Sequence, residues 1–116
     1  MPYEKESKKT LNYPIEMVFK SAKSCIVQMG GKILKDEQND GVLYAQMDKK
    51  LFGDYLGDRS KLEIKFTEVE NNKTEIYIYA YPLNAVGQKL MFGARKDVVE
   101  RMMTAFYEQI EKKLQE

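Results

Sequence analysis

The sequence of 116 residues contains no histidine and one cysteine, Cys25. Without histidine, the protein lacks the commonest general acid–base residue, the commonest metal ligand and the base of any Ser-His or Cys-His pair. One cysteine cannot form an intrachain disulfide or the cysteine clusters that bind zinc and iron–sulfur centres. The Ser-x-x-Lys nucleophile pattern is also absent. We therefore predict no cofactor, no intrinsic metal and no enzymatic activity.

The sequence also lacks an excess of charge and any long apolar run. Lys and Arg number 19 and Asp and Glu number 18, for a net charge of +1, whereas dedicated nucleic-acid-binding proteins carry a basic excess. A nucleic-acid partner is thus disfavoured. No apolar run approaches the ~20 residues that span a bilayer, and the N-terminal segment has neither the apolar region of a signal peptide nor a lipobox cysteine. These features predict a cytoplasmic protein, provided that no leader precedes Met1 in the natural chain.

The composition that remains is typical of one small globular domain. Apolar residues make up 43% of the chain and charged residues 32%, and the length is close to the commonest domain size. Residues 1–7 are polar, so we predict a frayed N-terminal tail followed by a single α+β domain at 8–116.

Hydrophobic periodicity predicts elements in the order β-α-β-β-β-β-α. Apolar residues recur with helical spacing from Pro14 to Met29, where Gly30-Gly31 supplies the residue that ends a helix. Cys25 lies on this apolar stripe and is predicted to be buried rather than reactive. A second helix, from Ala94 to about Gln115, carries a wide stripe that includes Phe106. Strands are predicted at 8–13, 32–38, 42–49 and 59–69, and from Thr74 to Tyr81, with Pro82 closing the last.

A curved antiparallel sheet with two helices on one face would bury every apolar set in this pattern. The right-handed crossover rule makes the first two strands parallel. This order resembles that of helix-grip, or TATA-binding-protein-like, domains, and more specifically that of a family of small uncharacterised prokaryotic domains. The resemblance covers residues 8–115, implies the fold alone and carries over no catalytic residue. It rests on Tyr13-Pro14, Val18-Phe19, Ala22, Gly30, Gly41, Thr74 and the last amphipathic helix.

The strand at 74–81 has one aliphatic face and one tyrosine face. Because successive side chains alternate, Tyr77, Tyr79 and Tyr81 point away from the core. Tyr44 on the third strand should join them, and Lys61, Glu63 and Lys65 should lie among them. Neighbouring lysine stems could cover these rings. Alternatively, Tyr44, Lys65, Tyr77, Tyr79 and Tyr81 form a face for a protein partner or for self-association, which leaves a monomer or a homodimer open.

Two links between strands are unusually apolar. If the strands alternate in direction, the links 50–58 and 83–93 fall at the same end of the sheet. They could cap the core against each other, or they could form the mouth of a groove for an apolar or amphipathic small ligand or a peptide, bounded by the C-terminal helix. The predicted groove residues are Leu51, Phe52, Tyr55, Leu56, Leu90, Met91 and Phe92.

Overall fold

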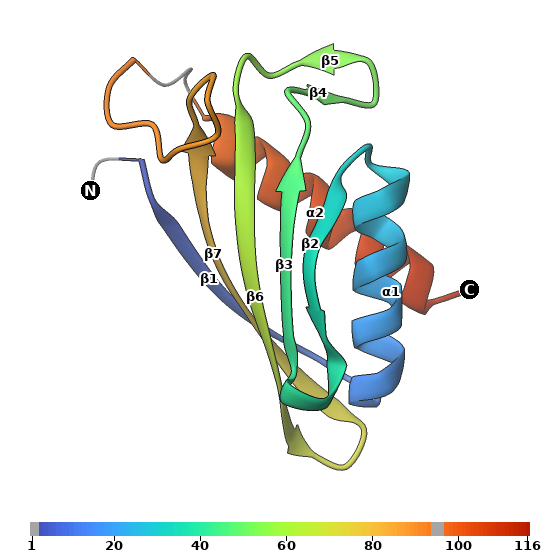
Figure 1. Ribbon diagram of the computed structural model, residues 1–116. Helices are drawn as coiled ribbons and strands as arrows, with labels where there is room; N and C mark the ends of the chain where they lie inside the picture. The colour runs from blue at the N-terminus through green and yellow to red at the C-terminus, as the bar shows by residue number, and fades with distance from the viewer. Residues whose placement is uncertain (1–2, 94–96) are drawn as a thin grey trace.

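The computed structural model describes residues 3–93 and 97–116. Within these residues, five strands form one antiparallel sheet, and two helices cover one of its faces (Figure 1). This arrangement confirms the predicted α+β fold. The main elements are β1 (Lys5–Leu11), α1 (Ile15–Gln28), β2 (Lys32–Glu37), β3 (Val42–Met47), β6 (Arg59–Glu70), β7 (Lys73–Leu83) and α2 (Val98–Leu114). The turn η1 (Gln38–Asp40) joins β2 to β3, and a small hairpin of β4 (Lys50–Leu51) and β5 (Asp54–Tyr55) separates β3 from β6.

The strand order is β1-β7-β6-β3-β2, with every neighbouring pair antiparallel. It follows that β1 and β2 run in the same direction, as the crossover rule predicts. They nevertheless lie at opposite edges of the sheet. The long hairpin of β6 and β7 occupies the middle, and β1 pairs with β7 so that Lys5 lies opposite Ala80 and Leu11 opposite Thr74.

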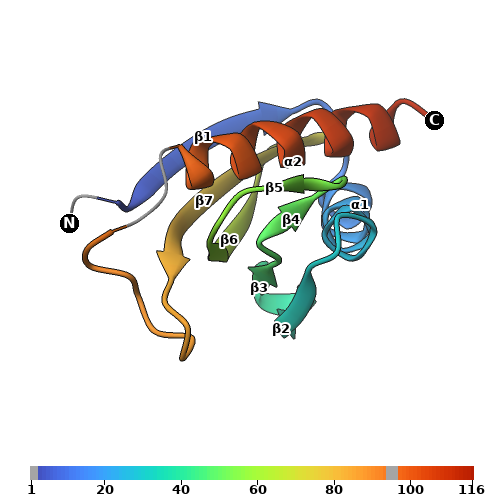
Figure 2. The same cartoon turned by 90° about the horizontal axis from the view of Figure 1, so that it is seen from above.

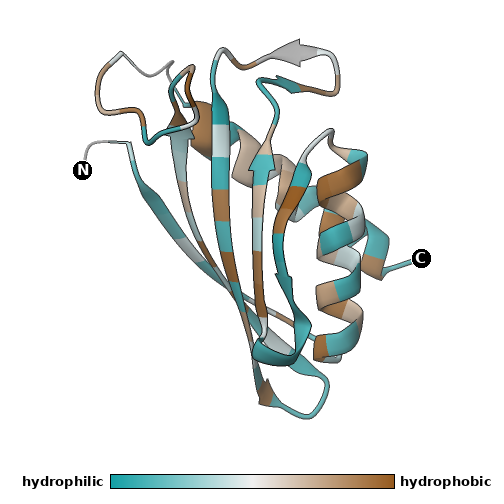
Figure 3. Cartoon of the chain, in the orientation of Figure 1, coloured by the Kyte–Doolittle hydropathy of each residue, from teal (hydrophilic) through white to brown (hydrophobic). Residues whose placement is uncertain are grey.

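The core lies between the sheet and the helices. Hydrophobic and polar residues alternate along the strands (Figure 3), and the apolar set of each central strand points inward. Phe19 of α1 and Phe106 of α2 are both fully buried, and the ring centroids of Phe19 and Phe66 are 4.9 Å apart. The prediction that this fold buries the apolar residues of its strands is confirmed for the inner face of β3, β6 and β7. The residues concerned are Leu43, Ala45, Met47, Leu62, Ile64, Phe66, Ile76, Ile78 and Ala80.

The helices lie on the concave face of the sheet, where they run in different directions and contact each other (Figure 2). Pro14 precedes α1, and Gly30, with φ +86°, follows its end in the left-handed conformation that terminates a helix. Neither helix in the described part of the chain is long and apolar enough to cross a membrane.

The first strand begins at Lys5, three residues before its predicted start, and ends at Leu11, so that Tyr13 lies outside it. Lys5, Ser7 and Lys9 face α2, but they contact its polar side chains. Ser7 Oγ lies 2.7 Å from the Tyr107 hydroxyl, and Lys9 Nζ lies 2.7 Å from the Glu111 carboxylate. A strand whose inner face is polar shows no alternation of hydrophobic and polar residues. The sequence pattern therefore did not predict residues 5–7 as part of β1.

Other boundaries differ for local reasons. The predicted start of the last helix, Ala94, lies with 95–96 outside the described residues. The described helix begins at Val98, because Asp97 has a left-handed φ of +59°. Strand β7 continues through Pro82 to Leu83, whereas the pairing with β1 ends at Ala80. Beyond Ala80, β7 no longer pairs with β1, and the Pro82 carbonyl accepts a hydrogen bond from the Leu90 N–H at 2.9 Å instead. Pro82 is the second-last residue of the strand, where a missing N–H is tolerated.

Candidate functional site

The two apolar links meet at one end of the sheet, beyond the ends of β3, β6 and β7 (Figure 1). A pocket of about 530 Å³ lies between them. Gly57 and Asp58 line it from the first link, and Asn84 and Leu90 line it from the second. This volume is within the range of small-molecule sites.

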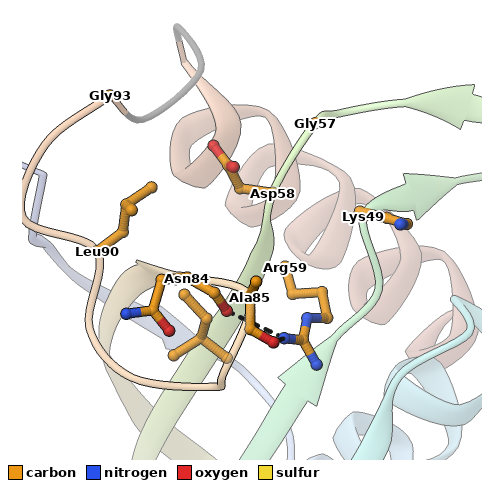
Figure 4. A pocket seen from close by; sticks show the side chains of 9 residues that line it. Lys49, Gly57, Asp58, Arg59, Asn84, Ala85, Leu90 and Gly93 are labelled. Carbon is orange, nitrogen blue, oxygen red and sulfur yellow. Dashed lines mark hydrogen bonds between the residues drawn. The ribbon is translucent and has the colours of Figure 1, made fainter.

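Arg59, the first residue of β6, lies in this pocket (Figure 4). Its guanidinium group donates hydrogen bonds to the backbone carbonyls of Asn84 at 3.0 Å and Ala85 at 3.1 Å. The Asn84 side-chain oxygen accepts hydrogen bonds from the backbone N–H groups of Val86 at 3.0 Å and Gln88 at 2.9 Å. These bonds hold the first half of the second link in a defined turn.

The β4–β5 hairpin lies beside α2. The backbone N–H of Leu56 donates to the Lys49 carbonyl at 2.7 Å and closes the base of the hairpin. At the tip, Phe52 and Gly53 both have positive φ, +50° and +88°. A groove of about 520 Å³ runs between the hairpin and α2, with Leu51 and Phe52 on one side and α2 on the other. The α2 side is formed by Asp97, Glu100, Arg101, Thr104, Ala105 and Glu108.

The predicted groove residues whose side chains are described fall into four environments. Leu56 belongs to the core and is 4% exposed, and Leu51 packs partly buried against the same core. Phe52 lines the groove beside α2 and is 59% exposed. Leu90 lines the pocket between the links. Met91 and Phe92 are exposed on the second link, Phe92 at 86%, and the side chain of Tyr55 lies outside the described residues.

The tyrosine face lies on the side of the sheet opposite the helices. Tyr44, Tyr77, Tyr79 and Tyr81 are each partly exposed. The register confirms that charged residues lie among them: Lys65 is opposite Tyr77, Glu63 is opposite both Tyr79 and Tyr44, and Lys61 is opposite Tyr81.

A charged side chain contacts each tyrosine on this face. The Tyr77 hydroxyl donates to Glu6 Oε1 at 2.6 Å, a hydrogen bond that raises the pKa of Tyr77. The ammonium of Lys89 lies 4.6 Å from the ring centroid of Tyr81, and those of Lys35 and Lys61 lie 5.2 and 5.4 Å from that of Tyr44. Cation–π contacts of this kind stabilise partly exposed rings.

Sequence reasoning missed two charged residues that organise this end of the molecule, Arg59 and Lys89. Strand alternation carried a signal for Arg59, because Leu62 points inward and Arg59, three residues before it, must point outward. No local signal marked Lys89. It reaches the tyrosine face because the second link folds back along β7, where Lys89 bridges Leu83 and the Leu90 N–H donates to the Pro82 carbonyl at 2.9 Å.

The reactive groups of the chain are few. Cys25 is buried in α1, and burial raises the pKa of its thiol, so the nucleophilic thiolate is disfavoured. Across residues 3–93 and 97–116, no group of three or more Cys, Asp and Glu side chains has the proximity to hold a metal ion.

Comparison with known proteins identifies the fold. No protein-family model matches the sequence, and no curated protein matches it. Among solved structures, Ara h 8.0201 has a TM-score of 0.64 at 10% identity, over 95% of this chain and 95% of that one. PFC0360w, an HSP90 activator from Plasmodium falciparum, has a TM-score of 0.61 at 13% identity, over 97% and 96%. The Zhui aromatase/cyclase from Streptomyces sp. R1128 has a TM-score of 0.53 at 11% identity, over 92% and 90%.

At these identities the likeness shows the fold alone. The narrower resemblance to small prokaryotic domains stays a prediction, because no family model supports it. The five-stranded antiparallel sheet of the described residues, covered on one face by α1 and the long α2, is a helix-grip fold.

Proposed function

We propose that this protein is a non-enzymatic binding module for an apolar or amphipathic small ligand or peptide. The ligand binds at the loop end, defined as the links 50–58 and 83–93, the pocket between them, and the groove between the β4–β5 hairpin and α2. The observation that carries this proposal is the gathering of exposed apolar side chains there. Phe52, Val86, Met91 and Phe92 all belong to the links, and their exposed fractions are 59, 78, 39 and 86%.

The rim of the loop end fits an amphipathic ligand better than a purely apolar one. Arg59 lines the pocket, and Arg101 and Glu108 line the groove beside Phe52. Ligand sites commonly combine an apolar lining with a few polar groups that fix orientation. The apolar body of the ligand would contact Leu51, Phe52 and Leu90, and its polar end would stay at the rim.

The assignment as a non-enzyme rests on the residues of this chain. The fold is compatible with catalysis, because one solved structure of the same fold is an aromatase/cyclase. This chain, however, offers no histidine, and its one thiol is buried with a raised pKa. A binding role requires neither group.

Native mass spectrometry of protein purified from cells tests the proposal, because it detects a retained ligand directly. The double variant Phe52→Ser with Phe92→Ser removes two exposed rings from the loop end, so the fold should be retained. We expect the variant to lose the co-purifying ligand. The matched control is Leu34→Ser with Val69→Ser, which removes two apolar side chains, each 47% exposed, from β2 and β6 away from the links.

The control should retain the ligand and the wild-type melting temperature. Equal ligand occupancy in the wild type and in both double variants would contradict binding at the loop end. Wild-type protein without any bound small molecule, and without affinity for small apolar probes, would contradict the function itself.

The alternative is a protein-interaction or self-association module that uses Tyr44, Lys65, Tyr77, Tyr79 and Tyr81. It is supported by the partial exposure of four tyrosine rings on one face. The charged side chains that contact those tyrosines weigh against it, because a partner would have to displace them.

A further inference from the structure

Ser60 is a buried residue whose hydroxyl group has no hydrogen-bond partner in the part of the chain that the structure describes. Its side chain is on the inner face of β6 and is 1% exposed. The other buried polar residue of that part, Thr74, donates a hydrogen bond to the Tyr13 carbonyl at 2.9 Å. Buried hydroxyl groups are normally paired, because an unpaired one loses its hydration without compensation. Ser60 is therefore an exception that requires an explanation.

The position of Ser60 places it directly below the loop end. It is the second residue of β6, four residues after Leu56 at the base of the β4–β5 hairpin, and α2 begins at the same end of the sheet (Figure 1). Its neighbours across the sheet are Met47 on β3 and Pro82 on β7, both buried. The unpaired hydroxyl is thus at the end of the core from which a ligand of the proposed function would enter.

The surrounding core can rearrange. Met47 lies beside Ser60 in the sheet, and Met102 is buried near the start of α2. Methionine side chains are flexible and fill irregular spaces, so they can repack around a ligand. The hairpin above is attached at its base through Lys49 and Leu56 and has left-handed residues at its tip. The hairpin continues directly from the last pair of β3 and β6, Met47 and Ser60, so a ligand that reaches Ser60 from this end would pass beside it.

The buried groups also limit the ligand's charge. No Lys, Arg, Asp or Glu side chain is among the buried residues of the described chain. A carboxylate or ammonium group brought beside Ser60 would lose its hydration without meeting a counter-charge, which is strongly unfavourable. A neutral hydroxyl or carbonyl group would instead complete the hydrogen bonding of Ser60, which can both donate and accept.

We propose that Ser60 is a specificity-determining residue that hydrogen-bonds one neutral hydroxyl or carbonyl group of a mostly apolar ligand inserted beneath the β4–β5 hairpin. This inference rests on the proposed function and adds the chemical class of the ligand. It predicts discrimination against apolar molecules that lack such a group and against ligands that would place a charge at Ser60.

A set of three probes of similar shape tests this inference: naphthalene, 2-naphthol and 2-naphthoate, titrated at pH 7 and followed by isothermal titration calorimetry or by NMR chemical shifts. We expect the wild type to bind 2-naphthol about tenfold more tightly than naphthalene, the effect of one buried hydrogen bond. 2-Naphthoate, whose carboxylate would stay at the rim, should bind to the wild type and to Ser60→Ala with the same affinity. In Ser60→Ala, naphthalene affinity should stay within about twofold, and the preference for 2-naphthol should disappear. The control Ser7→Ala, which removes a paired hydroxyl on β1, should retain the preference.

The melting temperature of Ser60→Ala distinguishes a ligand-binding role of Ser60 from a structural one. Without a probe, its melting temperature should equal or exceed that of the wild type, because the hydroxyl makes no bond to the described residues. A melting temperature several degrees lower would show that Ser60 has a structural partner and would overturn the inference. Equal affinities for naphthalene and 2-naphthol in the wild type would overturn it while leaving the proposed function intact. A wild type that binds none of the three probes would count against both.

Discussion

The ammonium group of Lys89 lies 2.7 Å from the Glu4 carboxylate and 3.0 Å from the Tyr79 hydroxyl. One residue of the second link therefore joins the segment before β1 to the tyrosine face. Since the same link forms a wall of the loop-end pocket through Leu90, the two candidate surfaces share a structural element. A substitution of Lys89 should therefore alter the structure of both the tyrosine face and the loop-end pocket.

The first prediction concerns the pH dependence of this contact. The hydrogen bond from Lys89, together with that of Tyr79, holds the pKa of Glu4 below its ordinary value of 4.5. A lowered folded-state pKa means that the contact stabilises the fold above the unfolded-state pKa and that this contribution is lost as the pH falls through the lower, folded-state pKa. The contribution to stability should be small, because both side chains are partly exposed.

An NMR titration of the Glu4 carboxyl group measures this shift directly. We expect a midpoint below 4.5 in the wild type and a return toward that value in Lys89→Met. Lys8→Met, which removes another lysine of the same sheet edge, serves as the control. Identical Glu4 midpoints in the wild type and in Lys89→Met would show that the contact does not persist in solution.

The second prediction concerns the attachment of α2 to the sheet. Phe106 is fully buried, so Phe106→Ala should reduce the free energy of unfolding by about 3–5 kcal/mol, a large part of a typical domain's stability. Thr104→Ala, an exposed change on the same helix, should stay within about 0.5 kcal/mol. Urea denaturation of both variants measures the difference. Similar midpoints for the two would mean that α2 does not pack through Phe106.

The third prediction compares two glycines with left-handed backbones. Gly41 has φ +65° and Gly30 has φ +86°, so alanine at either position should cost about 1–2 kcal/mol. A Cβ at Gly41 would also lie 2.5 Å from the Phe66 carbonyl oxygen, whereas one at Gly30 would meet nothing within 4 Å. The Phe66 backbone cannot move away from this Cβ without cost, because its N–H donates a hydrogen bond to the Gly41 carbonyl at 2.8 Å.

Gly41→Ala should therefore destabilise the protein more than Gly30→Ala does. Thermal unfolding of the two variants side by side measures the order. The reverse order would show that the close approach of β3 and β6 at Gly41 is absent in solution.

The fourth prediction separates the two functional hypotheses. If the tyrosine face binds a second copy, Tyr77→Lys with Tyr79→Glu should convert a dimer into a monomer at modest cost in stability. The cost is limited because the new charges would face Glu6 and Lys89, the partners that the tyrosine hydroxyls now contact. Light scattering after size-exclusion chromatography measures the mass, with Thr67→Lys on the outer face of β6 as the control.

Under the loop-end hypothesis, the same double variant should leave the mass unchanged and retain a bound small ligand. A wild-type monomer that holds no ligand and is indifferent to changes at both surfaces would exclude both functions.

Local periodicity in the sequence was sufficient to predict the central elements. Leu43, Ala45 and Met47 alternate along β3, and the helical spacing around Phe19 and Phe106 marks the buried stripes; all of these side chains are buried. The prediction succeeded because a period of two or of 3.6 residues depends on neighbours in the chain. Gly30 and Gly41 were predictable for the same reason, since each ends or turns a local element.

The candidate site was predictable only in outline. The apolar composition of the links indicated that they would lie together, and strand alternation placed them at one end. Leu56 lies in the core, Phe52 in the groove and Leu90 in the pocket. These locations depend on how the β4–β5 hairpin and the second link fold back onto the rest of the domain. Loop conformation of this kind carries little sequence periodicity.

The sequence by itself determined which face of each central strand and helix is buried, because that choice is made by the spacing of apolar residues within one element. Only the tertiary structure decided that β1 and β2 lie at opposite edges, that Lys89 reaches Glu4 and Tyr79, and that the Ser60 hydroxyl lies unpaired among the described residues beneath the loop end. These relationships join residues far apart in the chain, or depend on every neighbour of one buried atom. They are set by the packing of the whole fold, and no local pattern encodes them.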